Sequence, residues 1–153
     1  MAQVAPKLRE VFGQLVTGKA RWPLYLWGPV GTGKTRAALA LTDFLAGRSE
    51  YYTMEKLCTA AMERDAWKRT LGDLCRADMV IVDDIGEREK VGDLYATTLK
   101  AVLDARDYRH NRAGIYTGNV SDLDLPRLLD DRLVSRLLCG TEFKLTGPDR
   151  RKE

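Results

Sequence analysis

Residues 28–35 read GPVGTGKT, a spacing of glycine, lysine and threonine that can hold the phosphates of a nucleoside triphosphate. Glycines let the backbone curl so that amide N–H groups point at phosphate oxygens, and the dipole of a following helix adds to the attraction. Lys34 can reach the β- and γ-phosphates, and the Thr35 hydroxyl can ligate Mg²⁺. The residues predicted to contact nucleotide are Gly28, Pro29, Val30, Gly31, Thr32, Gly33, Lys34, Thr35 and Arg36.

Two adjacent carboxylates, Asp83 and Asp84, follow the unbroken apolar run 79–82. Such a run is typical of a central strand covered on both sides, and ligands of open α/β sheets bind at the carboxyl ends of the strands. We predict that Asp83 holds Mg²⁺ through water and that Asp84 polarises the attacking water. The alternative is a solvated acidic turn, and the apolar strand before it makes that alternative the less favoured one.

Two further groups could act on the phosphates. Asn119 ends the segment GIYTGN and could present its amide to the γ-phosphate or the lytic water, although Gly118-Asn119 is equally a turn dipeptide. Arg132 and Arg136 are four residues apart and therefore share one helical face, from which an arginine can neutralise a transferring phosphoryl group in cis or in a neighbouring subunit. From composition alone, local ion pairing with acidic residues such as Asp130 is the favoured interpretation of these arginines.

These residues need a sheet to bring them together. Five short apolar segments alternate with helical patterns, which predicts an α/β fold with a five-stranded parallel sheet and helices on both faces. The predicted strands are 24–27, 50–53, 79–82, 114–117 and 142–145. The predicted helices are 6–16, 34–46, 54–74, 93–110 and 123–138, with a break allowed near 63–67 and Gly47 placed to end the second helix.

Length and composition limit the class of protein. The chain has 153 residues, about one domain, with 44% hydrophobic and 31% charged residues, which is ordinary for a globular protein. No apolar run approaches the roughly 20 residues that span a bilayer, and the N-terminus lacks a signal-peptide core, so we expect no membrane association and a cytoplasmic location.

Three scattered cysteines are expected to be buried free thiols. The net charge of +3 permits an acidic or nucleic-acid partner without demonstrating one.

Taken in order, four motifs resemble the AAA+ ATPases of the bacterial replicative helicase-loader family, the DnaC/IstB-like group. They are GPVGTGKT at 28–35, VIVDDIG at 80–86, YTGN at 116–119 and DRLVSRL at 131–137. The resemblance implies a three-layer P-loop NTPase, an AAA+ core whose helical lid is reduced or absent. We expect a single core domain over 1–153, with an N-terminal helical lead-in at 1–21, a nucleotide-binding core at 22–145 and a basic tail at 146–153. Family loaders usually carry a longer N-terminal extension that grips the helicase, so that module is either missing from this sequence or not needed.

The resemblance also implies roles for the residues. Lys34 and Thr35 would be the Walker A pair, Asp83 and Asp84 the Walker B pair, and Asn119 sensor 1. Arg136, with Arg132 as second choice, would be the arginine finger that completes a neighbour's site.

The ligands and partners implied are ATP or ADP, Mg²⁺, single-stranded DNA, a replicative helicase and further copies of the chain that assemble on ATP binding. Hydrolysis is expected to be slow without a partner or DNA. Two alternatives remain open: an IstB-like transposition helper with a transposase as partner, and an ATP-dependent regulatory or adaptor module with weak or no hydrolysis. Basic residues interleaved with aromatics at 64–69 and 108–110 could contact nucleic acid or be a solvated surface.

Overall fold

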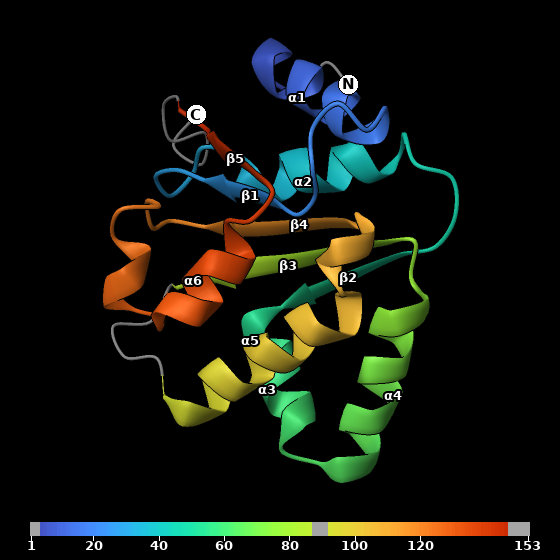
Figure 1. Ribbon diagram of the computed structural model, residues 1–153, viewed down its shortest axis with the longest axis vertical. Helices are drawn as coiled ribbons and strands as arrows, with labels where there is room; N and C mark the ends of the chain where they lie inside the picture. Colours follow the sequence, from blue (N-terminus) through green and yellow to red (C-terminus); the bar gives the residue numbers. More distant parts are fainter. Residues whose placement is uncertain (1–3, 87–91, 147–153) are drawn as a thin grey trace.

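The computed structural model describes residues 4–86 and 92–146, which form an open sheet with helices on both faces (Figure 1). The strands are β1 (Leu24–Trp27), β2 (Ser49–Thr53), β3 (Met79–Ile85), β4 (Ala113–Gly118) and β5 (Thr141–Lys144). Their order is β2-β3-β4-β1-β5, and every neighbouring pair is parallel. The predicted fold class is confirmed, and the carboxyl ends of all the described strands lie at one edge of the sheet.

The helices form two layers. In Figure 1, α1 (Pro6–Val16) and α2 (Lys34–Thr42) lie on one side of the sheet. On the other side lie α3 (Met54–Ala61), α4 (Arg64–Arg76), α5 (Asp93–Arg106) and α6 (Asp131–Leu137), with α6 packed against α5. None of the described helices has both the length and the apolar character needed to cross a membrane.

Apolar periodicity explains the buried surfaces. In α1, the buried residues Leu8, Phe12 and Leu15 recur at helical spacing and therefore share one face, where Phe12 meets Trp22 edge to face at 6.2 Å between ring centroids. The apolar part of β3 is buried on both faces of the sheet, as its unbroken pattern predicted. Burial of this kind supplies most of the free energy that holds the sheet between its helical layers.

The strand boundaries agree with the prediction to within one residue, except that β3 runs on to Ile85. Several helix boundaries were wrong. The second helix ends at Thr42, because the following N–H groups bond to carbonyls three residues back, as in a 3₁₀ turn, instead of four. Examples are Asp43 N to Ala40 O and Phe44 N to Leu41 O. Gly47 is therefore not the residue that ends α2. It is needed in the turn before β2 instead, since its φ is +106° and a Cβ there would lie 2.2 Å from Asp78 Oδ2.

The predicted helix 54–74 is two helices, because the Glu63 carboxylate accepts hydrogen bonds from the backbone N–H groups of Asp65 and Ala66 and starts α4 there. The break that the prediction allowed near Glu63 is therefore present. The predicted helix 123–138, in contrast, was wrong. A 3₁₀ turn, η2 (Leu125–Arg127), precedes α6, and Asp130 starts α6 by accepting from Leu133 N at 2.8 Å. The fourth predicted helix ends at Arg106 and is followed by a second 3₁₀ turn, η1 (Tyr108–His110).

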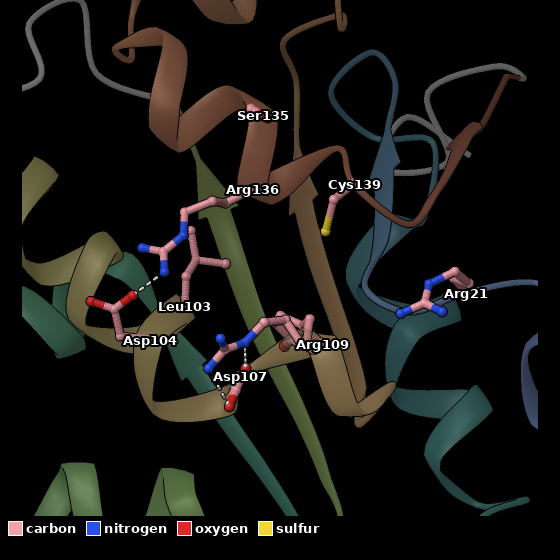
Figure 2. Close-up of a pocket in the computed structure, with 9 residues that line it drawn as sticks. Arg21, Leu103, Asp104, Asp107, Arg109, Ser135, Arg136 and Cys139 are labelled. Carbon is pink, nitrogen blue, oxygen red and sulfur yellow. Dashed lines mark hydrogen bonds and ion pairs between the residues drawn. The ribbon is translucent and has the colours of Figure 1, made fainter.

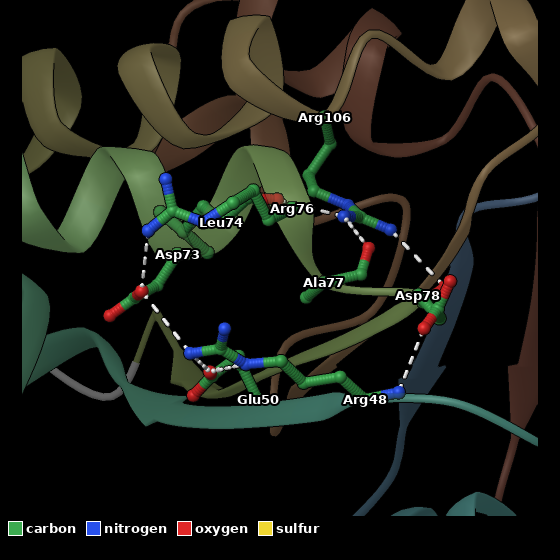
Figure 3. A network of polar contacts seen from close by, with 8 residues as sticks. All are labelled: Arg48, Glu50, Asp73, Leu74, Arg76, Ala77, Asp78 and Arg106. Atoms are coloured by element: carbon green, nitrogen blue, oxygen red, sulfur yellow. Dashed lines mark hydrogen bonds and ion pairs between the residues drawn. The ribbon is translucent and has the colours of Figure 1, made fainter.

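A fully buried arginine connects the helical layer to the sheet (Figure 3). Arg106 Nη1 donates to the carbonyls of Leu74 and Ala77 at 2.8 and 2.6 Å, and Nη2 donates to Ala113 O at 2.8 Å. Burial lowers the pKa of this guanidinium. Leu74 lies in the last turn of α4, Ala77 directly follows that helix, and Ala113 begins β4. Arg106 therefore fixes the spacing of elements on the side of the sheet away from the strand carboxyl ends.

Candidate functional site

The loop 28–35 leaves β1 at the carboxyl edge of the sheet and leads into α2. Gly31 and Gly33 have φ values of +83° and +88°, a backbone conformation that favours glycine. Thr32 lies between these two glycines, and its hydroxyl closes the turn 29–32 by donating to Pro29 O at 2.9 Å. The first amides of α2 have no acceptor within their own helix, so the loop opens onto hydrogen-bond donors that suit an anion.

The loop is held tightly at the edge of the sheet. Gly28 N donates to Gly118 O of β4 at 3.2 Å, and Leu145 N donates to Trp27 O at 2.7 Å just past β5. A Cβ at Gly28 would lie 2.1 Å from Leu145 O, so only glycine fits where the loop begins. The neighbouring strands therefore set the position of the loop.

Lys34 lies inside the curve of its own loop. Its side-chain Nζ donates to Gly28 O and Pro29 O, both at 2.9 Å, and the residue is only 9% exposed. The positive charge is thus held at the centre of the loop, where phosphate oxygens could replace the two carbonyls as acceptors. The role of Lys34 in binding the β- and γ-phosphates stays a prediction with which this position is compatible.

The structure brings Thr35 and Asp83 together across the gap between α2 and β3. The Thr35 hydroxyl donates to Asp83 Oδ2 at 2.7 Å, and Asp83 is 2% exposed. Two further hydroxyls donate to the same carboxylate: Tyr51 Oη to Oδ2 at 2.6 Å, and Thr117 Oγ1 to Oδ1. A carboxylate beside a threonine hydroxyl is a hard oxygen donor set, so these residues fit Mg²⁺.

The two acidic residues lie near the carboxyl end of β3, as predicted, but the strand continues past them to Ile85. Val82 pairs with Tyr116 and Ile85 with Gly118, so Asp83 and Asp84 together face the single residue Thr117. This is a β-bulge, a feature that bends a strand and changes the direction of a side chain. Asp84 has a φ of +65°, and its N–H donates to Thr117 Oγ1 at 3.2 Å. The Thr117 hydroxyl thus contacts both residues of the bulge.

Asn119 comes directly after β4, next to the loop. It follows Gly118, whose carbonyl accepts from Gly28 N, and it is half-buried. Three strand ends therefore bring the predicted phosphate, metal and sensor residues to one edge of the sheet. The other predicted loop residues, including half-exposed Val30 and exposed Arg36, lie in the same loop and the first turn of α2.

The two candidate arginines lie elsewhere, on the exposed face of α6. Arg136 forms an ion pair with Asp104 of α5 (Figure 2). Both residues line a cavity of about 640 Å³ that also includes Arg21 and Asp107, which precede β1 and β4. The cavity therefore lies toward the amino ends of the strands, and residues 28–35 do not line it.

The expected local pairing of the arginines is not what the described residues show. Asp130 accepts from Leu133 N at the start of α6, and Arg136 pairs with a different helix. Arg132 is exposed one turn earlier, beside a second cavity that is bordered by Asp130, Asp131 and Lys100. Arg136 therefore does not reach the phosphate loop of its own chain in this structure.

Tyr51 and Thr117 were not predicted as site residues. Thr117 carried a weak signal, since it is a polar residue in an otherwise apolar strand, two positions before Asn119. Tyr51 carried no signal of this kind, because its contact depends on the register that pairs Tyr51 with Ile81. Burial, followed by the hydrogen bond to Asp83, raises the pKa of the Tyr51 phenol, so it remains a donor.

Comparison with known proteins identifies one curated relative and several solved structures of similar fold. No protein-family model matches the chain. The chromosomal replication initiator protein DnaA of Lacticaseibacillus paracasei is 25% identical over 138 residues, which cover 83% of this chain and 29% of that protein. The chain thus spans less than a third of the length of this curated relative.

Solved structures share the fold of this chain. The replication initiator DnaA bound to AMPPCP and single-stranded DNA matches with a TM-score of 0.76 and 20% identity, over 95% of this chain and 47% of that chain. The DnaC helicase loader matches with a TM-score of 0.69 and 20% identity, over 80% of this chain and 77% of that chain. The chain therefore has the fold of these DnaA and DnaC structures, a parallel sheet with helices on both faces.

Proposed function

We propose that this protein binds and hydrolyses ATP with Mg²⁺, as an AAA+ protein that acts in DNA replication in the manner of a helicase loader. One observation carries the proposal: Thr35 of the phosphate loop and the buried Asp83 of β3 share a hydrogen bond of 2.7 Å. A hydroxyl and a carboxylate held at this distance, next to a lysine inside a glycine-rich loop, suit a metal-bound triphosphate far better than a solvated acidic turn.

Each residue of the edge would have a distinct task. The Lys34 ammonium would exchange its two loop carbonyls for phosphate oxygens, and the amides of the loop and of α2 would hold the rest of the phosphate chain. Thr35 and Asp83 would hold Mg²⁺, which when bound neutralises charge on the phosphates. Asp84 would orient and polarise the attacking water, and the Asn119 amide would contact the γ-phosphate or that water.

The arginine finger would act on a neighbouring copy. Arg136 is exposed and lies near the amino ends of the strands, whereas the phosphate loop lies at their carboxyl ends. An arginine in this place cannot serve its own loop without a large movement of α6, and it is accessible to a second subunit. We therefore expect ATP-dependent self-assembly, with Arg132 as the alternative residue for this role.

The partners belong to the proposal as well. The DnaA structure with the same fold carries AMPPCP and single-stranded DNA, and the DnaC structure is that of a helicase loader. These likenesses support single-stranded DNA and a replicative helicase as partners, which would place the protein in the cytoplasm. We also propose the division into a lead-in at 1–21, a core at 22–145 and a basic tail, of which residues 147–153 lie outside the described part of the chain.

The test is binding and turnover of nucleotide. Titration with a fluorescent ATP analogue and Mg²⁺ should show saturable binding that Lys34→Ala abolishes and that the exposed-lysine control Lys19→Ala leaves unchanged. ATP hydrolysis should then be measured with and without single-stranded DNA over a salt series, in which a basic contact surface predicts affinity that falls as salt rises. Absence of binding, or equal binding by Lys34→Ala, would overturn the proposal. Binding without hydrolysis in any condition would favour a regulatory module instead.

A further inference from the structure

We propose that Tyr51, on β2, is a positioning residue for magnesium. Its hydroxyl holds the Asp83 carboxylate of β3 in an orientation that leaves one acceptor position for a metal-bound water. This inference rests on the proposed nucleotide function, and it concerns a residue outside the four sequence motifs. Its starting point is the set of three hydroxyls that surround the Asp83 carboxylate.

The three hydroxyls use most of the hydrogen-bond acceptor sites of the Asp83 carboxylate. An ionised carboxylate offers about four lone-pair sites, two on each oxygen. Thr35 and Tyr51 donate to Oδ2 at 2.7 and 2.6 Å, and Thr117 donates to Oδ1. Within residues 4–86 and 92–146, both sites of Oδ2 are thus used and one site of Oδ1 remains. A carboxylate held in this way has a fixed orientation before any metal arrives.

Tyr51 supplies a contact that water cannot easily replace. Its Cα pairs with that of Ile81, and its side chain reaches two residues further along β3 to Asp83. Because Asp83 is 2% exposed, loss of the phenol oxygen would leave part of the carboxylate without a donor. The carboxylate would then turn toward other donors and lose the orientation that a metal-bound water needs.

Substitution of Thr35 and substitution of Tyr51 would affect metal binding in different ways. The Thr35 hydroxyl is itself a predicted metal ligand, so its substitution removes a direct contact. Among the residues that the structure describes, the Tyr51 hydroxyl forms a hydrogen bond with Asp83 alone, so the effect of its loss would pass through the carboxylate. Partners of metal ligands that act in this way typically contribute 10–100-fold to metal affinity.

The neighbouring tyrosine provides a matched control. Tyr52 follows Tyr51 on β2, so its side chain leaves the opposite face of the sheet. It is also partly buried, and burial together with the nearby Glu50 raises its pKa to about 12. Tyr51→Phe and Tyr52→Phe therefore remove the same atom from the same strand, but only the first removes a hydrogen bond to Asp83.

The experiment measures nucleotide affinity rather than turnover. A fluorescent, non-hydrolysable ATP analogue is titrated in EDTA and then at increasing Mg²⁺, for the wild-type chain and both variants. For Tyr51→Phe we expect affinity in EDTA within about twofold of wild type and a Mg²⁺ midpoint raised about 10-fold. For Tyr52→Phe we expect neither value to change.

Three results would overturn the inference, and they are distinguishable. A Mg²⁺ midpoint for Tyr51→Phe within twofold of wild type shows that the phenol does not position Asp83 for the metal. An equal loss of affinity in EDTA and in Mg²⁺ shows a purely structural role. Absence of nucleotide binding by the wild type refutes the proposed function itself, whereas the first two results leave that function standing.

Discussion

Replacing Thr117 by valine should destabilise the protein more than the loss of a single hydroxyl normally does. The substitution keeps the shape and the β-branched character of the side chain but removes the hydroxyl that donates to Asp83 Oδ1 and accepts from Asp84 N. A hydrogen bond to a charged group contributes about 1.5–3 kcal/mol, and a neutral one contributes about 0.5–1.5 kcal/mol. Thr117 is 1% exposed, so water cannot take its place. We therefore expect the free energy of unfolding to fall by about 2–4 kcal/mol.

Urea unfolding measures this change directly, with tryptophan fluorescence as the probe. Thr117→Ser is the matched control, because it keeps the hydroxyl and removes a methyl group, at a cost of about 1 kcal/mol. The valine variant should thus be the less stable of the two, although it fills the site better. The reasoning would be refuted if Thr117→Val unfolded within about 0.5 kcal/mol of wild type, or if the serine variant were the less stable.

Three further changes test separate parts of the structure. Asp84→Asn should keep nucleotide binding and lower turnover by about 10²-fold or more, measured as phosphate release; an unchanged rate would remove Asp84 from the mechanism. If Arg136 acts on a neighbour, mixing Arg136→Ala subunits with Asp84→Asn subunits should partly restore hydrolysis, and no recovery would indicate a structural arginine. Arg106→Met should lower the free energy of unfolding by about 3 kcal/mol or more, because it leaves buried carbonyls without donors. Urea unfolding measures this change, and a stability close to that of wild type would contradict the prediction.

The sequence predicted the sheet and the phosphate loop because both depend on local patterns. The glycines at 31 and 33, the apolar run before them and the helix after them are neighbours in the chain, and the structure keeps them so. The break before α6 had a local signal too, which the helical pattern obscured. Pro126 lacks a backbone donor, and Asp130 is a favoured residue at a helix start, so both argue against one continuous helix there.

The bulge at Asp83 and the contact from Tyr51 could not be predicted in the same way. Each depends on the register between strands that are far apart in the sequence, and a shift of one residue would move every side chain to the other face. Two acidic residues after an apolar run predict negative charge at the end of a strand. They do not reveal that the strand continues to Ile85 or that one threonine on β4 contacts both residues.

The pairing of Arg136 with Asp104 bears on how the copies would assemble. The two side chains are 44% and 46% exposed, and an ion pair so accessible to solvent contributes at most about 1 kcal/mol. A triphosphate in a neighbouring copy carries more negative charge than one carboxylate and offers several acceptor oxygens, so it should displace Asp104 readily. If Arg136 acts on a neighbouring copy, as proposed, Asp104 would hold its guanidinium beside α5 without preventing that transfer. On this argument Asp104→Asn should leave ATP-dependent assembly largely intact, and loss of assembly in that variant would show that Asp104 itself belongs to the interface.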